Sequence, residues 1–291
     1  LGYHVPSARM QMYDKIVLAQ GPVAFLSQSG GHGQGFARLG PTMGIGFSKI
    51  ISYGNALMMD CTDFLEYLAN DAETEIICMY LEGVRDGSKL TRLVTELVPR
   101  KPIIVWKGGL TSSGARAAAT HTSSLAGNRQ IWETFFRQTG ALPVGSIDEM
   151  ADLCMTFRQL KPFSGGRATV FGGGGGNNVA TADTCAEEGL ELPAPSSETR
   201  YKLLEFMTLV NQSVVNPMDA GSLFGSAALL RRALDAVGAE RQIDVIILHL
   251  GADYAKWLSA QAMAEFKSFV VDFNRSSPTA KPVVVAIQEQ E

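Results

Sequence analysis

One histidine lies in a stretch of small and hydroxylated residues. His121 belongs to residues 114–127, where nearly every other residue is Gly, Ala, Ser or Thr. Such neighbours leave space around an imidazole, and the hydroxyls of Thr120, Thr122 and Ser123 could orient an oxyanion bound beside it. A lone histidine in a loop is more often a hydrogen-bonding surface residue. Two interpretations therefore stand at this point, a surface histidine and an imidazole placed at an anion site.

Two glycine-rich turns could supply backbone amides to an anion. Residues 27–31, Ser-Gln-Ser-Gly-Gly, follow an apolar run and precede a helical pattern. A turn of this kind combines free N–H groups with the positive end of a helix dipole, which suits a phosphate or a carboxylate. An ordinary tight turn is the alternative. No Gly-Lys-Ser/Thr follows, so the turn is not the phosphate loop of a nucleotide hydrolase.

The second turn contains five consecutive glycines at 172–176, followed by Asn177. Glycine clusters mark places where the backbone turns sharply or lets a ligand approach closely. We therefore expect this loop to expose its amides to an anion. Interpreted as a dinucleotide fingerprint, Gly172-x-Gly174-x-x-Asn177, the motif is weak because its third position is not small and apolar.

Glu82 comes directly after the apolar run 76–81. One interpretation is a solvated loop carboxylate. The other is a carboxylate that accepts a hydrogen bond from an imidazole, which fixes the tautomer of the ring and stabilises its cation.

The elements that must position these residues are short β-rich runs alternating with amphipathic stretches. This order predicts parallel strands with helices on both faces of the sheet, and ligands at the carboxyl ends of the strands. The breaker-rich segment 161–166 predicts a linker, after which the alternation restarts. We expect two tandem doubly wound α/β units. The expected strands are 23–27, 47–52, 76–81, 103–106, 168–171, 243–250 and 282–287, and the expected helices include 60–69, 177–188 and 254–272.

Composition excludes several classes of protein. The 291 residues carry a net charge of −4, which does not favour binding to nucleic acid or to an anionic membrane. No apolar run approaches the roughly 18 residues of a membrane span. The four cysteines are too scattered for a zinc site or a disulfide framework, so we expect reduced thiols, no metal site and a cytoplasmic protein.

Six motifs, taken together, resemble one family, the ADP-forming (NDP-forming) acyl-CoA synthetases, which are relatives of succinyl-CoA synthetase. The block at 114–127 is the most specific of them. The others are Ser-Gln-Ser-Gly at 27–30, Ile-Ser-Tyr-Gly-Asn at 51–55, Asp-x-x-Asp-x-Leu-x-Tyr-Leu at 60–68, Tyr-Leu-Glu-Gly at 80–83 and Asn-Pro-Met-Asp at 216–219.

The resemblance implies two tandem flavodoxin-like domains and a reaction that converts a carboxylate, CoA and ATP to acyl-CoA, ADP and phosphate. The intermediates it implies are an acyl phosphate and a phosphohistidine. His121 matches the phosphorylated histidine, and Glu82 matches the carboxylate that braces its ring. Ser29, Gly30 and Gly31 match the helix start that receives the phosphoryl group.

In the second unit, the resemblance implies a glycine loop near the acyl substrate and a turn lining the same region. The matching residues are Gly174, Gly175, Gly176, Asn177, Asn216 and Asp219. CoA, ATP and Mg are implied as substrates of the complete enzyme, and no tightly bound cofactor is implied.

The domain organisation expected from the resemblance has three parts. Residues 1–20 are expected to be a remnant or linker from a CoA-binding Rossmann-like domain, residues 21–163 the phosphohistidine-bearing domain, and residues 164–291 a second CoA-ligase-like domain. We expect a fragment whose partners are that CoA-binding domain and an ATP-grasp domain or subunit. The resemblance also implies an oligomer, and we expect no turnover by the chain alone. The alternatives are a regulatory or scaffold module of the same fold and a flavodoxin-like nucleotide-binding protein.

The chain also departs from the family pattern at three places. Gly31-His32-Gly33 stands where relatives usually carry Ala-Leu-Gly, so His32 is either a second imidazole at the phosphate seat or a packing residue. Ser123 stands where glycine is common. Met58 stands where an acidic residue is common, and this last departure predicts a more apolar pocket that suits a larger acyl group.

Overall fold

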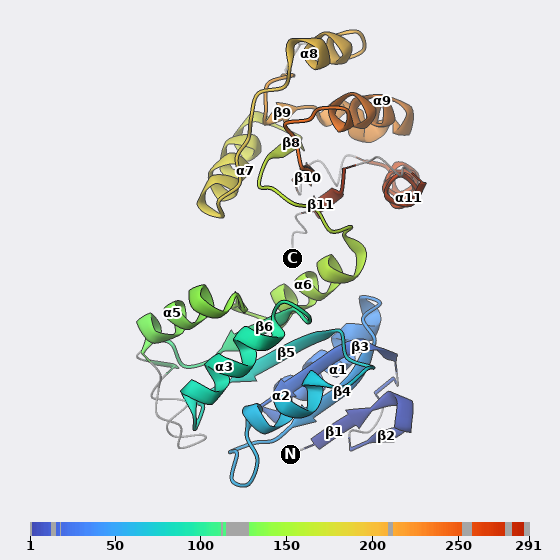
Figure 1. Ribbon diagram of the computed structural model, residues 1–291. Helices are drawn as coiled ribbons and strands as arrows, with labels where there is room; N and C mark the ends of the chain where they lie inside the picture. Colours follow the sequence, from blue (N-terminus) through green and yellow to red (C-terminus); the bar gives the residue numbers. More distant parts are fainter. Residues whose placement is uncertain are drawn as a thin grey trace. The chain divides into compact units, whose positions relative to one another are not determined.

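The computed structural model describes residues 2–12, 16–17, 19–111, 113–114, 128–208, 212–251, 258–276 and 281–287. The chain divides into two compact units, with the division after Gln159. Each unit contains its own sheet (Figure 1). The expected fold class, two parallel-sheet α/β domains in tandem, is confirmed.

The first unit has a seven-stranded sheet in the order β2-β1-β4-β3-β5-β6-β7. Five neighbouring strands of this sheet are parallel to one another, namely β4, β3, β5, β6 and β7. The strands are β1 (Gly2–Val5), β2 (Met10–Gln11), β3 (Gln20–Ser27), β4 (Phe47–Ser52), β5 (Ile76–Leu81), β6 (Ile103–Lys107) and β7 (Leu142–Val144). The helices are α1 (Gly30–Thr42), α2 (Cys61–Ala69), α3 (Gly87–Leu97), α5 (Arg129–Thr139) and α6 (Ile147–Gln159), and a short 3-10 helix, η1, spans Pro6–Ala8.

Helices cover both faces of this sheet because alternate strand residues point to opposite sides. In β5, Ile77, Met79 and Leu81 pack in one core with α2, α3 and α5. Ile76, Cys78 and Tyr80 pack in a second core with α1 and α6. All six β5 residues are buried, which explains why the sequence shows a continuous apolar run there instead of an alternating one.

Residues 2–11 form part of the first sheet. β1 pairs antiparallel with β4, and β2 pairs antiparallel with β1. That residues 1–20 are a remnant or linker from a CoA-binding domain stays a prediction. The pairing of β1 covers the hydrogen-bonding edge that β4 would otherwise expose.

The second unit has a four-stranded parallel sheet in the order β11-β10-β8-β9. Figure 1 shows α7 on the opposite side of this sheet from α9 and α11. The strands are β8 (Ala168–Gly172), β9 (Met218–Asp219), β10 (Val245–Leu250) and β11 (Val283–Ile287). The helices are α7 (Gly175–Glu187), α8 (Ser197–Leu204), α9 (Ala227–Gly238) and α11 (Ala260–Ser276), with a 3-10 helix, η2, at Gly221–Gly225. The expected start of the last helix, at 254, lies outside the described residues.

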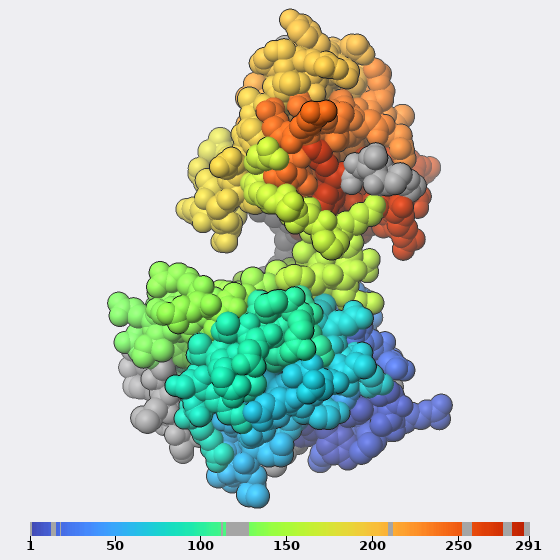
Figure 2. All heavy atoms as spheres, in the orientation of Figure 1, coloured from blue at the N-terminus to red at the C-terminus, as the bar shows by residue number. Residues whose placement is uncertain are grey.

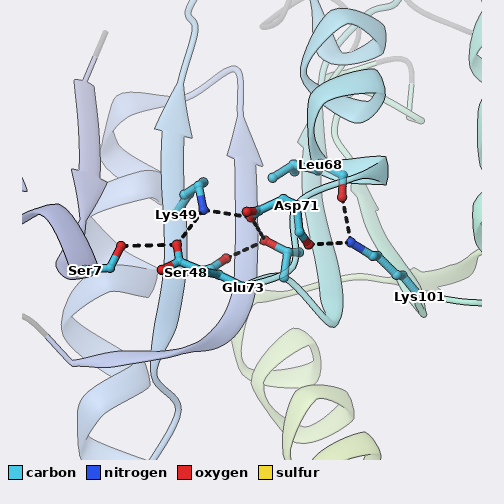
Figure 3. A network of polar contacts seen from close by, with 8 residues as sticks. Ser7, Ser48, Lys49, Leu68, Asp71, Glu73 and Lys101 are labelled. Atoms are coloured by element: carbon cyan, nitrogen blue, oxygen red, sulfur yellow. Dashed lines mark hydrogen bonds and ion pairs between the residues drawn. The ribbon is translucent and has the colours of Figure 1, made fainter.

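A partly buried ion-pair network ties the turn before β5 to the sheet (Figure 3). Lys49 of β4 is buried, and its Nζ lies 2.7 Å from Asp71 Oδ2 and 2.9 Å from Glu73 Oε2. Glu73 also accepts a hydrogen bond from Ser7 of η1 at 3.1 Å. Lys101 donates from the other side to the carbonyl oxygens of Leu68 and Asp71. The network thereby joins η1, β4 and the α2–β5 turn.

Removing the cation from this network should destabilise the first unit. Lys49→Met removes the cation from Asp71, which is partly buried and keeps its hydrogen bond from Thr74, and the expected loss in free energy of unfolding is on the order of 2 kcal/mol. The measurement is urea-induced unfolding followed by circular dichroism. The matched control is Arg92→Met, because Arg92 pairs with Glu96 on the exposed surface of α3 and should contribute less than about 1 kcal/mol. Equal losses in the two variants would contradict the assignment.

Candidate active site

The parallel strands of the first unit end at a common edge. Ser27 of β3 is in register with Ser52 of β4 and with Tyr80 of β5, and Leu81 of β5 is in register with Lys107 of β6. The residues that follow these strands therefore lie at the same edge of the sheet. This edge carries the Ser29 turn and Glu82, as the sequence predicted for ligand-binding loops.

The first turn of α1 has the geometry of an anion seat. Ser29 is the N-cap residue, and its Oγ accepts a hydrogen bond from the His32 N–H at 3.3 Å. Ser27 holds the turn through its Oγ, which accepts from the Ser29 N–H at 3.1 Å. The N–H groups of Gly30 and Gly31 have no acceptor within the helix. Because neither glycine carries a side chain, their amides stay accessible to an anion.

Gln28 fixes the backbone after β5. Its Oε1 accepts hydrogen bonds from two consecutive backbone amides, those of Glu82 and Gly83, the latter at 2.9 Å. Its own N–H donates to the carbonyl of Tyr80 at 3.1 Å. The Gln28 side chain thus links the turn before α1 to the turn after β5. The sequence analysis did not single out Gln28, although its place between Ser27 and Ser29 is a signal that could have been used.

Glu82 is buried at this edge. The residue is only 7% exposed, and its Oε1 accepts a hydrogen bond from the Tyr80 hydroxyl at 3.1 Å. The alternative of a solvated loop carboxylate therefore does not hold. A buried, oriented carboxylate is suited to accept an imidazole N–H or to balance a cation.

Lys107 is a buried cation that sequence reasoning missed. It is 5% exposed, and its Nζ donates to the carbonyl oxygens of Glu82, at 2.9 Å, and of Gly108. Burial lowers the pKa of Lys107 to about 8, and Glu82 opposes this shift. The sequence does contain a signal for this residue, because a lysine directly follows the apolar run 103–106.

His32 packs in an aromatic cluster at the same edge. Its ring centroid lies 4.4 Å from that of Tyr80 and 4.5 Å from that of Trp106. Burial lowers the pKa of His32, and Glu82 opposes this shift. The ring is therefore mainly neutral at pH 7, and the structure places it both beside the anion seat and in packing contact.

His121 lies outside the described residues, together with 115–120 and 122–127. The segment that contains it starts from the described edge, because residues 108–111 follow β6 directly. Asn128, after the segment, is the N-cap of α5, and its Oδ1 accepts from the Gln130 N–H at 2.8 Å. Residues 108–111 and Asn128, on either side of this range, are placed by β6 and α5.

The glycine loop of the second unit is open. Gly174 has a φ of +95°, and its N–H donates to Asp219 Oδ1 at 3.2 Å. A Cβ built on Gly174, Gly175 or Gly176 would meet no atom within 4 Å. The structure therefore brings Asp219 to the loop and leaves the start of α7 accessible.

The structure also places the two other predicted substrate residues of this unit, Asn216 and Asn177. The Asn216 amide accepts from the Val170 N–H at 2.9 Å and donates to the carbonyls of Ala168 and Pro193 at 2.8 and 3.0 Å. These bonds hold β8 to its neighbouring segments. Asn177 donates weakly to the Gly173 carbonyl at 3.4 Å.

Asn178 and His249 also lie at this loop and were missed. Asn178 is buried, its Oδ1 faces Gly172, and within the described ranges this oxygen has no hydrogen-bond partner. His249 of β10 is in register with Gly172, and its Nδ1 shares a hydrogen bond of 2.7 Å with the Thr181 hydroxyl. Neither residue has a distinctive motif in the sequence.

No group of three or more His, Cys, Asp and Glu side chains among the described residues is arranged to hold a metal ion. None of the helices within the described ranges has the length and apolar character needed to cross a membrane.

At the first-unit edge, the backbone amides at the start of α1 can bind an anion beside a buried carboxylate, Glu82, and a buried amine, Lys107.

The Lys107 amine should titrate near pH 8. In ¹⁵N-lysine NMR spectra its signal is expected to change with a midpoint near that value and to be missing in Lys107→Arg. A lysine in the unfolded chain has a pKa of about 10.4, whereas Lys107 in the folded chain has a pKa of about 8. Between these two pKa values the folded chain binds fewer protons than the unfolded chain. The free energy of unfolding, relative to Lys107→Arg, should therefore rise with pH across this window. A midpoint above about 10 would contradict the assignment.

Comparisons with known proteins identify the family and the fold of the chain. Residues 20–157 match the family model for the succinyl-CoA ligase like flavodoxin domain. The chain is 36% identical over 237 residues to ADP-forming acetate–CoA ligase I of Archaeoglobus fulgidus, covering 81% of this chain and 34% of that protein. It is 40% identical over 203 residues to the alpha subunit of ADP-forming acetate–CoA ligase II of Pyrococcus furiosus, covering 70% of this chain and 44% of that subunit.

A solved structure has the same fold over nearly the whole chain. The apo form of acetyl-coenzyme A synthetase 1 from Ca. Korarchaeum cryptofilum superposes with a TM-score of 0.81 and 30% identity, covering 98% of this chain and 61% of that one. The chain spans less than two thirds of the length of each of these relatives. On these matches, the chain belongs to the ADP-forming acyl-CoA synthetase family, related to succinyl-CoA synthetase, and residues 20–157 are its succinyl-CoA ligase-like flavodoxin domain.

Proposed function

We propose that this chain is the phosphohistidine-bearing and acyl-binding part of an NDP-forming acyl-CoA synthetase. The overall reaction converts a carboxylate, CoA and ATP to acyl-CoA, ADP and phosphate. The observation that carries the proposal is the edge where the amides of α1, the buried Glu82 and the start of the His121 segment meet. That edge has the parts needed to hold a phosphoryl group next to an imidazole.

The reaction has three transfers in the synthetic direction. His121 attacks the γ-phosphorus of ATP, forming a P–N bond as the bond to the ADP oxygen breaks. An oxygen of the carboxylate then attacks this phosphorus, the P–N bond breaks, and an acyl phosphate forms. The CoA thiolate attacks the acyl carbon, and phosphate leaves. Neutral imidazole is a good nucleophile near pH 7, so the first step needs no strong base.

The chain's own residues position and stabilise charge in these steps. The amides of Gly30 and Gly31, with the Ser29 cap, bind phosphoryl oxygens at the positive end of α1. Glu82 accepts the imidazole N–H of His121, fixing the tautomer and stabilising the cationic ring. Lys107 acts through Glu82, since it holds the backbone of that residue. Preorganised groups of this kind stabilise the transferred charge without reorganisation.

The second unit supplies substrate contacts. Gly174, Gly175, Gly176 and Asn177 offer amides and a polar side chain to the acyl substrate, and Asp219 holds the loop through Gly174. Asn216 supports the same region through its bonds to β8. These proposed roles are supported by the match of these residues to the family motif and by the open space around the glycines of the loop.

The partners are those that complete the reaction. We propose that an ATP-grasp domain or subunit binds Mg-ATP and delivers the phosphoryl group, and that a Rossmann-like domain binds CoA, within an oligomer. The isolated chain should not catalyse the overall reaction. All four cysteines are buried and free, which is compatible with a cytoplasmic protein.

Phosphorylation of His121 is the central test. With an ATP-grasp partner and Mg-[γ-³²P]ATP, the chain should acquire acid-labile, base-stable label, and His121→Ala should acquire none. His32→Asn serves as a matched control and should still be labelled. Label that persists in His121→Ala and disappears in His32→Asn would move the phosphoryl group to His32. Absence of label in the wild-type chain would favour the regulatory or nucleotide-binding alternatives.

Glu82→Gln tests the bracing carboxylate. The amide keeps the size of the side chain but cannot stabilise an imidazolium as a carboxylate does, so the rate of labelling should fall about tenfold or more. Glu75→Gln is the control, because Glu75 is exposed just before β5. Circular dichroism checks that both variants fold. A labelling rate that Glu82→Gln leaves unchanged would remove Glu82 from the mechanism.

A further inference from the structure

Ser52 carries a buried hydroxyl that takes no part in holding the fold together. It is the last residue of β4 and is only 3% exposed. Its Oγ has no hydrogen-bond partner within the described part of the chain. A buried hydroxyl without a partner costs free energy, and most buried polar atoms of folded proteins are paired. Such a hydroxyl at the edge where ligands bind is suited to a ligand oxygen.

The comparable hydroxyls near Ser52 all have structural partners. Ser27, its in-register neighbour on β3, donates to the Ser29 carbonyl at 2.7 Å and accepts from the Ser29 N–H at 3.1 Å. Ser48 lies on the same strand and the same face as Ser52, and its Oγ shares a hydrogen bond of 2.7 Å with the Thr74 hydroxyl. These serines hold a turn and a strand in place, whereas Ser52 does neither.

The Ser52 hydroxyl faces the first residue of α1. A Cβ built on Gly30 would lie 3.8 Å from Ser52 Oγ, and apart from the backbone adjoining Gly30 no other atom of the described residues would come within 4 Å of it. A ligand oxygen near that position needs to approach Oγ by only about 1 Å to accept its hydrogen. The start of α1 is therefore bordered by a side-chain donor from a different strand.

Ser52 also lines a cavity of about 700 Å³ at the end of β4. The loop between β4 and α2 contributes Gly54, Asn55 and Met58 to the same lining. Figure 2 shows this loop in light blue, projecting at the lower end of the first unit. The cavity gives a ligand room to reach the end of β4 without unfolding of the sheet.

A hydroxyl in this position adds to the amides of α1 in a specific way. The N–H groups of Gly30 and Gly31 are fixed by the helix, whereas a hydroxyl hydrogen rotates toward its acceptor. A phosphoryl group carries several oxygens, so donors from two elements can bind different ones. Hydrogen bonds to a charged oxygen are also stronger than those between neutral groups.

We propose that Ser52 is a further residue of the phosphate seat and that its hydroxyl donates a hydrogen bond to the phosphoryl group bound at the start of α1. The bond comes from the end of β4 and so ties the position of the phosphoryl group to the sheet as well as to the helix. This inference rests on the proposed function, which supplies the phosphoryl group.

Binding of inorganic phosphate to the full chain tests Ser52 without turnover. The dissociation constant is measured by ³¹P NMR titration, and the midpoint of thermal unfolding is measured by circular dichroism. Ser52→Ala should weaken phosphate binding about tenfold, because it removes one hydrogen bond to a charged oxygen. The same change should not lower the unfolding midpoint, because it breaks no hydrogen bond among the described residues.

Ser48→Ala is the matched control, since it removes a buried hydroxyl from the same strand. It breaks the hydrogen bond to Thr74, so the unfolding midpoint should fall by about 3 °C. Phosphate affinity should stay that of the wild-type chain. The two variants are thus expected to have opposite effects on binding and on stability, which a purely structural role of Ser52 would not produce.

Three results overturn the inference. They are equal phosphate affinities of Ser52→Ala and the wild-type chain, as expected if Ser52 bonds only to water, a fall in the unfolding midpoint of Ser52→Ala as large as that of Ser48→Ala, and a wild-type chain that binds no phosphate. The proposed function is tested separately. Weaker phosphate binding by Ser52→Ala without labelling of His121 would leave the Ser52 contact standing and overturn the proposed function. Labelling of His121 with equal phosphate affinities would do the reverse.

Discussion

The in-register alignment of β3, β4, β5 and β6 is the constraint on which the first-unit site depends. Parallel strands in register end at one edge, so residues far apart in the chain, such as Gln28, Glu82 and Lys107, become neighbours. The edge then needs partners for the backbone groups that leave the sheet. Gln28 accepts from two amides after β5, and Lys107 donates to two carbonyls. Gln28 and Lys107 thus satisfy the backbone hydrogen bonds at the sheet edge, and they also position the Glu82 carboxylate that is proposed to take part in the reaction.

Burial sets the charge states at this edge. Lys107 is buried and His32 is half-buried, so the pKa of each is lowered, and the Glu82 carboxylate opposes both shifts. Close to neutral pH this leaves a mainly neutral imidazole and a mainly protonated amine next to a seat made of backbone amides. A fixed dipole at the start of α1 contributes positive potential that does not titrate. The anion seat therefore does not depend on a surface cation that salt would screen.

The two units use their glycine turns differently. At the α1 turn, Ser29 caps the helix, and a Cβ on Gly30 would lie 3.8 Å from Ser52 Oγ of β4. At the α7 turn, no side chain caps the helix, and Asp219 instead holds Gly174 from a neighbouring strand. The first turn is therefore closed by a side-chain cap from its own sequence. The second leaves a row of amides open.

Local sequence patterns sufficed to predict the strands, helix starts and turns that depend on residues close together in the chain. The apolar runs marked β4, β5 and β8, Asp60 marked the start of α2, and the glycine clusters marked both turns, because strand periodicity, helix capping and turn conformation are short-range effects. Contacts between distant segments required the folded chain. The pairing of β1 with β4, the burial of Glu82 and Lys107, the bonds of Asn216 to β8 and the cavity beside Ser52 each arise where segments far apart in sequence meet. Hydrogen bonding and exclusion of water at those meeting points are properties of the tertiary structure alone.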